Sequence, residues 1–170
     1  MAITKIQSES LNLADDYAFT GTITGAGEAN DGSFFAYQGS NQSISGQTTT
    51  TIQFNNTVFD VDSGFDAANY RYTIPTGKGG KWFFQASIFW EPANASNQYG
   101  DINIVKNGTN LFQSRQAVSG NKQRRDVFYS IGIGSFSAGD NIDVRVWSSN
   151  GNSTDANNKL TYFTGFRISS

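Results

Sequence analysis

From residue 33 onward, apolar and polar positions alternate in short runs that end at Gly, Asn, Asp or Pro. A period of two places successive side chains on opposite faces of a β-strand, and turn residues separate one strand from the next. The pattern predicts strands at 33–37, 49–54, 57–60, 71–74, 81–90, 101–106, 110–116, 124–136, 141–147 and 159–168. This regular spacing predicts an all-β sandwich or barrel.

Alternation within three of these runs predicts which side chains form the core. They are Trp82, Phe84, Ala86, Ile88 and Trp90 on one strand, Ile142, Val144 and Val146 on another, and Leu160, Tyr162, Phe166 and Ile168 on the last. Burial of each large ring contributes about 2 to 3 kcal/mol to folding. These strands alone therefore supply most of a core.

The opposite face of two strands carries further rings: Phe83 and Phe89 on one strand, and Phe163 on the last. Contiguous exposed rings are uncommon on small monomeric proteins and mark contact surfaces. We therefore expect a partner surface here. Scattered exposed rings, or a second small core beneath a loop, are the alternative for any one of them.

The segment 65–84 contains YRYTIP at 70–75, a glycine-rich reversal, and GKWFF at 80–84, followed much later by GD at 139–140 and FTGF at 163–166. In this order the motifs resemble the globular head of complement component one-q and its tumour necrosis factor relatives. The resemblance implies a jelly-roll β-sandwich that forms a homotrimer. It also implies that Phe83, Gln85, Ser87 and Phe163 lie near the subunit contacts.

The first 32 residues differ in texture from the rest, with short apolar pieces, glycines and no helical or heptad repeat. AITKI at 2–6 and FTGTI at 19–23 resemble the opening of structural proteins of tailed, especially marine, bacteriophages. The resemblance implies a virion-attachment leader and linker at 1–32 and a head domain at 33–170. Its expected anchors are Ile3, Ile6, Leu11, Leu13, Tyr17 and Phe19.

Charge and composition exclude several functional classes. The formal net charge of -2 gives no basic footprint for nucleic acid. The sequence has neither a signal-peptide core nor the ~18 apolar residues of a membrane span, so we expect no membrane insertion. The absence of His and Cys removes the commonest general base and the thiol nucleophile.

Carboxylate pairs are the remaining catalytic chemistry, because glycoside hydrolysis needs only Asp or Glu. The candidates are Glu91, Asp101, Asp126 and Asp140. Pro92 makes Glu91 look like a strand exit, and the Gly139-Asp140 turn suits an Asp that caps backbone amides. We therefore expect a non-enzymatic protein.

Asp60, Asp62 and Asp66 form an acidic loop. Oxygen ligands of this kind bind calcium in some proteins of the resembled family, but the spacing does not match an EF-hand. Ordinary turn chemistry is the preferred interpretation, with no cofactor, and calcium is the alternative.

The sequence thus predicts a phage virion protein: a trimeric tail-fibre tip or adhesin-like appendage that other virion proteins hold through its leader. Polar segments at 94–99, 117–123 and 147–158 are the expected contacts with a host surface glycan or protein. A capsid or neck decoration (cement) protein and a free carbohydrate-binding lectin are the alternatives.

Overall fold

The computed structural model describes residues 32–91, 98–118 and 126–170. Within them the chain is almost entirely β-structure, with one short 3-10 helix, η2 (Asn157–Lys159). The strands are β1 (Ser33–Tyr37), β2 (Ser43–Ile44), β3 (Thr50–Thr51), β4 (Asn56–Asp60), β5 (Phe65–Asp66), β6 (Arg71–Thr73), β7 (Gly80–Trp90), β8 (Gln98–Lys106), β9 (Thr109–Val118), β10 (Asp126–Phe136), β11 (Asn141–Ser148), β12 (Asn152–Ser153) and β13 (Tyr162–Ser169).

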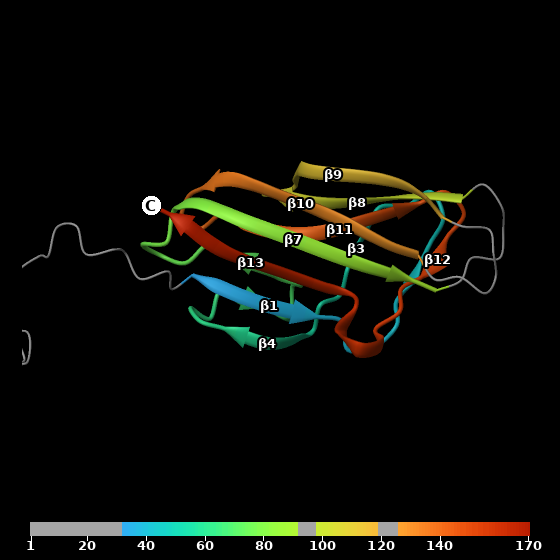
Figure 1. Ribbon diagram of the computed structural model, residues 1–170, viewed down its shortest axis with the longest axis horizontal. Coiled ribbons are helices and arrows are strands. Elements are labelled where there is room, and N and C mark those ends of the chain that lie inside the picture. Colours follow the sequence, from blue (N-terminus) through green and yellow to red (C-terminus); the bar gives the residue numbers. More distant parts are fainter. Residues whose placement is uncertain (1–31, 92–97, 119–125) are drawn as a thin grey trace, which may run out of the picture.

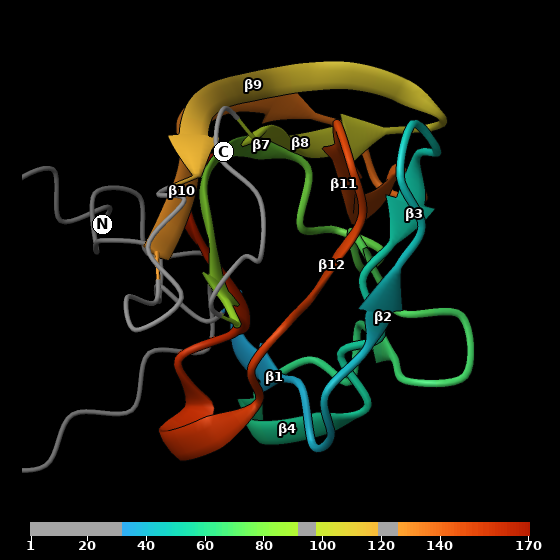
Figure 2. The same ribbon diagram turned by 90° about the vertical axis from the view of Figure 1, so that its right-hand side faces the viewer.

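The strands form two main antiparallel sheets. The first sheet has the order β10-β7-β13-β1-β4, and these strands lie side by side in Figure 1. The second sheet has the order β5-β6-β11-β8-β9, and β3 also pairs with β11. Viewed from one end, the two sheets enclose a common interior (Figure 2), and β2 and β12 make a separate small pairing. The predicted all-β sandwich is confirmed.

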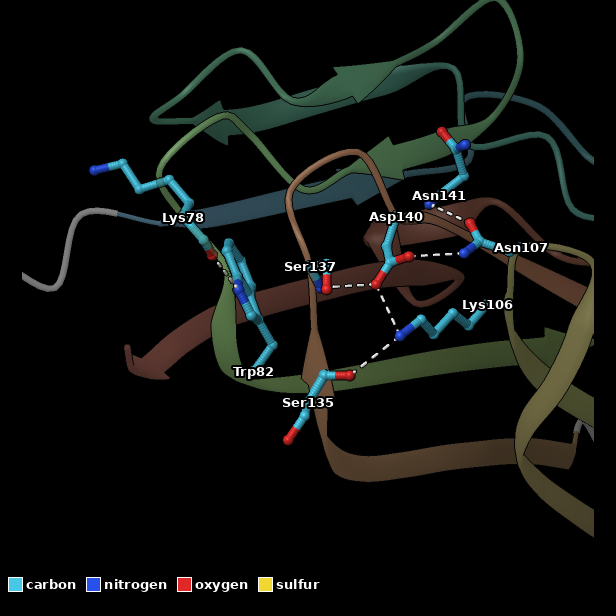
Figure 3. A network of polar contacts seen from close by, with 8 residues as sticks. All are labelled: Lys78, Trp82, Lys106, Asn107, Ser135, Ser137, Asp140 and Asn141. Atoms are coloured by element: carbon cyan, nitrogen blue, oxygen red, sulfur yellow. Dashed lines mark hydrogen bonds and ion pairs between the residues drawn. The ribbon is translucent and has the colours of Figure 1, made fainter.

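The core lies between the sheets and is rich in aromatic rings. The predicted inward faces of β7 and β11 are confirmed, because Trp82, Phe84, Ala86, Ile88, Trp90, Ile142, Val144 and Val146 are all buried. The Trp82 ring stacks on Phe84 at 5.7 Å, and its indole N–H donates to the Lys78 carbonyl at 2.9 Å (Figure 3). This hydrogen bond satisfies the polar atom of a ring that is otherwise surrounded by apolar groups.

The prediction for the last strand is wrong, because β13 faces the opposite way. Phe163 is 0% exposed in the core, whereas Phe166 is 40% exposed on the outer surface. Leu160 and Ile168 are also exposed. A Cβ atom on Gly165 would lie 2.5 Å from the Phe84 ring, so only glycine fits on this inward side beside Phe163. The inward side of β13 thus has a glycine next to its one large ring, whereas the outward side has more apolar residues. For this reason a count of apolar residues predicted the wrong side.

The two ends of the sandwich differ in what they carry. Gly32, where the described chain begins, accepts a hydrogen bond from the Arg167 amide at 2.8 Å, close to the end of β13. β7 begins at this end and runs for 11 residues, roughly 35 Å, toward the other end.

Among the described residues, no helix reaches the length and hydrophobicity of a membrane span.

Candidate functional site

The outer surface of the first sheet carries large apolar side chains that no part of the described chain covers completely. They are Phe35, Phe59, Phe83, Tyr129, Ile131, Ile133, Tyr162 and Phe166, and we call them the aromatic face. Ile131 is 57% exposed and Ile133 is 60% exposed. Such contiguous exposure is characteristic of a contact surface rather than of a solvated sheet.

Strand register arranges these side chains in rows across the sheet. Phe83 on β7 lies opposite Ile133 on β10 and Phe166 on β13. Because directly opposed residues point to the same side, the three side chains form one apolar row. The Phe83 and Phe166 rings stack with centroids 4.9 Å apart. The predicted outward facing of Phe83 is therefore confirmed.

A second row passes through Gln85, which lies opposite Ile131 and Thr164. The row continues to Phe35, whose ring is 5.1 Å from that of Tyr162 and 6.4 Å from that of Phe59. Gln85 is half-buried, and its side-chain amide donates to the Tyr162 hydroxyl at 2.8 Å. The face therefore includes a polar group that is already hydrogen-bonded within the chain.

Ser87 lies in a third row, directly between Tyr129 and Tyr162. It is 1% exposed, so its side chain offers no free surface, and its place near a subunit contact stays a prediction. A small residue between two large ones is covered by them, and the tyrosines offer the surface instead.

Burial and the nearby Tyr129 raise the pKa of Tyr162 against the opposing effect of Gln85, so this hydroxyl stays neutral at pH 7.

Phe163, the fourth expected contact residue, is not on the aromatic face. Its ring packs inside the sandwich, 5.0 Å from Phe34 and 5.8 Å from Phe84. It pairs in register with buried Ala86, whereas Phe166 pairs with Phe83. Phe166 is therefore the β13 ring that the sequence prediction should have chosen.

The expected anchors of the leader lie outside the described residues. They are Ile3, Ile6, Leu11, Leu13, Tyr17 and Phe19. Their attachment role, and the domain division at residue 32, stay predictions.

Asp140 closes the turn between β10 and β11, as its sequence context predicts. Its carboxylate accepts hydrogen bonds from the Ser137 amide (2.8 Å) and the Asn107 side chain (2.7 Å). It also forms an ion pair with the Lys106 ammonium at 2.8 Å (Figure 3). Burial alone would raise the pKa of Asp140, but these bonds together outweigh it and lower the pKa below its ordinary value. The side-chain oxygen Oδ1 of Asn107 in turn accepts a hydrogen bond from the Asn141 backbone amide at 2.8 Å.

The acidic loop also shows turn chemistry. The Asp60 carboxylate accepts from the Gly64 and Phe65 amides, and Asp66 accepts from the amides of Ala68 and Asn69. These bonds engage Asp60 and Asp66 with backbone amides, while Asp62 lies 4.0 Å from the Lys78 ammonium. In residues 32–91, 98–118 and 126–170, no group of three or more metal-ligating side chains is present.

The carboxylates considered for hydrolysis have structural partners. Asp101 is buried and forms a two-pronged ion pair with Arg115, at 2.6 and 2.7 Å. The Glu91 carboxylate accepts a hydrogen bond from the Asn41 side chain at 3.1 Å. Such carboxylates are held in place by their partners, which favours structural roles over proton transfer.

An open groove of about 410 Å³ lies at the end of the second sheet, lined by Gln47, Tyr99, Trp147, Ser149 and Asn150. The rings of Tyr99 and Trp147 are 5.6 Å apart. Two backbone contacts fix the walls: the Ser149 amide donates to the Tyr99 carbonyl at 3.0 Å, and the Gln47 amide donates to the Ser148 carbonyl at 2.7 Å.

Part of this groove was expected from the sequence and part was not. Tyr99 and the residues from Trp147 to Asn150 fall in segments that the sequence predicted to contact a host, but the structure places Tyr99 in β8 and Trp147 in β11 rather than in loops. Residues 92–97 and 119–125 lie outside the described part of the chain. Gln47 was missed, because it is remote in sequence and no local signal connects it to Trp147.

Comparison with known proteins supports the fold. Neither the models of protein families nor the curated protein sequences gave a match. Among solved structures, the chain is similar to murine APRIL at pH 5.0 (TM-score 0.61, 13% identity), with 80% of this chain and 98% of that chain covered. It is also similar to the globular domain of zebrafish complement 1qA (TM-score 0.55, 14% identity), with 81% and 97% covered. The chain therefore has the jelly-roll fold of the tumour necrosis factor and complement one-q heads.

Proposed function

We propose that this chain is a non-enzymatic virion protein of a tailed bacteriophage, a trimeric head that its leader carries on the particle. The observation that carries the proposal is the aromatic face, where large apolar side chains from adjacent strands of one sheet are exposed together. Its partner is a second and a third copy of the same chain. A closed symmetric ring would cover all three faces at once and leave none open for further growth.

Two features of the aromatic face, together with the fold of the chain, support association between copies. Its rows span β10, β7, β13 and β1, so they form one continuous surface rather than isolated side chains. The Tyr162 hydroxyl on this face accepts a hydrogen bond from the neighbouring Gln85, so neither of these two groups brings unpaired polarity into a contact. The jelly-roll fold is the one for which the sequence resemblance implies a trimer.

The placement of the chain ends supports an appendage. The described chain begins at Gly32, at the end of the sandwich where β7 starts, and the groove of Tyr99 and Trp147 lies toward the other end, where β11 finishes. A head attached through residues 1–32 would point this groove away from the particle. The assignment to a virion itself rests on the resemblance of the leader to phage structural proteins.

Electron microscopy of intact particles tests this role. A label at Ser170 should appear at a few sites near the tail, and a chain that lacks residues 1–27 should be absent from the particles although its head still folds. A label spread over the whole shell would favour a cement protein instead. Absence of the full-length chain from particles would overturn the proposal.

A further inference from the structure

We infer that the groove of Gln47, Tyr99, Trp147, Ser149 and Asn150 binds a neutral carbohydrate chain. This inference goes beyond the proposed virion role and rests on it, because it gives the outward-pointing groove a ligand. The groove is open, so an extended polymer can enter from the side. Its volume of about 410 Å³ falls within the range of sites that take small ligands or the end of a larger one.

The chemistry of the lining matches a sugar better than a peptide. Tyr99 and Trp147 line the groove with aromatic surface, which packs against the C–H groups of a pyranose, while Gln47, Ser149 and Asn150 have donors and acceptors for hydroxyls. None of the five side chains carries a formal charge. A peptide anchor would need an apolar hollow or an unpaired strand edge, whereas rings mixed with amides suit a ligand that is apolar and hydroxylated on alternate faces.

The ring of Tyr99 is held in position before any ligand arrives. The Arg115 guanidinium lies 5.4 Å from the Tyr99 ring centroid, and Asp101 fixes that guanidinium through two hydrogen bonds. Trp147 is on the strand beside Asp101, directly opposite it in register. A prearranged ring loses less conformational freedom on binding, which favours affinity for a weakly held ligand such as a sugar.

Three copies would present three such grooves on one head. Several weak sites on one particle raise the overall affinity for a repeating polymer without any new contact. A polysaccharide repeats the same unit many times, so its chemistry suits this arrangement.

The fluorescence of Trp147 gives a direct test. Trp82 and Trp90 are 0% and 1% exposed, so acrylamide should quench Trp147 far more than the other two tryptophans. The probes are short linear oligomers of glucose, galactose, mannose, rhamnose and N-acetylglucosamine, with oligomers of glucuronate and a pool of random peptides for comparison. At least one neutral oligomer should protect Trp147 from the quencher in the full-length protein.

Variants connect the protection to the groove. Tyr99→Ala and Trp147→Ala should each weaken binding of that oligomer, measured by calorimetry, by about tenfold or more. Leu111→Ala on the same sheet is the control, because Leu111 is 41% exposed and Tyr99 is 42% exposed. It should bind like the wild type.

Each other outcome overturns the inference. Protection by no neutral oligomer, by glucuronate alone or by peptides alone would reject a neutral carbohydrate as the ligand. Equal losses in Leu111→Ala and Tyr99→Ala would place binding elsewhere. Light scattering on the same samples separates this result from the proposed function: a trimeric mass without sugar binding rejects only the carbohydrate site, whereas a monomeric mass rejects the trimeric head.

Discussion

Phe83 and Phe166 stack with ring centroids 4.9 Å apart on the outer surface of the first sheet. They come from neighbouring strands and lie directly opposite each other in register. Each ring covers part of the other, yet Phe166 is still 40% exposed. Under the proposed trimer, a second copy of the chain would cover the side of this pair that is still exposed.

Substitutions at two neighbouring residues of β7 should have different effects, one on folding stability and the other on association. Trp82→Ala removes a buried ring and should cost about 3 to 5 kcal/mol of unfolding free energy, because the surrounding core cannot close the cavity. Phe83→Ala removes a surface ring and should mainly weaken association. Chemical denaturation of each variant, together with its mass in solution, separates the two effects. If Phe83→Ala prevents folding while Trp82→Ala is tolerated, the assignment of Trp82 to the core and Phe83 to the outer surface is wrong.

A similar contrast is expected on β13. Phe163→Ala should lower the unfolding free energy by about 3 to 5 kcal/mol, since Phe163 packs against Phe34 and Phe84 in the core. Phe166→Ala should leave the fold of the single chain nearly unchanged. Thermal unfolding at a low protein concentration, where association is weak, provides the measurement. Comparable losses in both variants would contradict the assignment of Phe166 to the outer surface.

The turn network at Asp140 should make stability depend on pH in the acid range. The folded pKa of Asp140 lies below its ordinary value of 3.8, so its contribution is fully present above that value and is lost as the pH falls through the folded pKa. Asp140→Asn should cost about 1 to 3 kcal/mol at pH 7. The unfolding free energy, measured by denaturation at several pH values between 2 and 7, should then change less with pH in the variant than in the wild type. An equal change with pH in both proteins would show that Asp140 is not responsible.

The sequence was most informative where one face of a strand is uniformly apolar. On β7 and β11, alternation identified the large inward residues, from Trp82 to Trp90 and from Ile142 to Val146, and missed only the buried Ser148 at the end of β11. On β13, Tyr162, Phe163, Phe166 and Ile168 do not alternate cleanly, so the apolar count favoured the wrong side. The inward positions include Gly165 and Arg167, which an apolar count cannot recognise as core-facing.

Other features were beyond reach of local sequence patterns. β2, β5 and β12 have two residues each, too few to show a period. The groove joins Gln47, Tyr99 and Trp147, which only the folded sheet brings together. Ser87 had the expected parity but is covered by two tyrosines from the neighbouring strands, and that cover depends on register.

The mass of the purified chain in solution tests the central claim most directly. Light scattering at micromolar concentration should give about three times the 18.5 kDa chain mass. Ile131→Asp should shift this mass to that of one chain, because a carboxylate in a closed apolar contact costs several kcal/mol per copy. Val61→Asp is the matched control, since Ile131 and Val61 are each 57% exposed but Val61 is in the turn after β4 and not on the aromatic face. It should remain trimeric. A wild-type chain that is monomeric, or an Ile131→Asp variant that keeps the trimeric mass, would contradict the account.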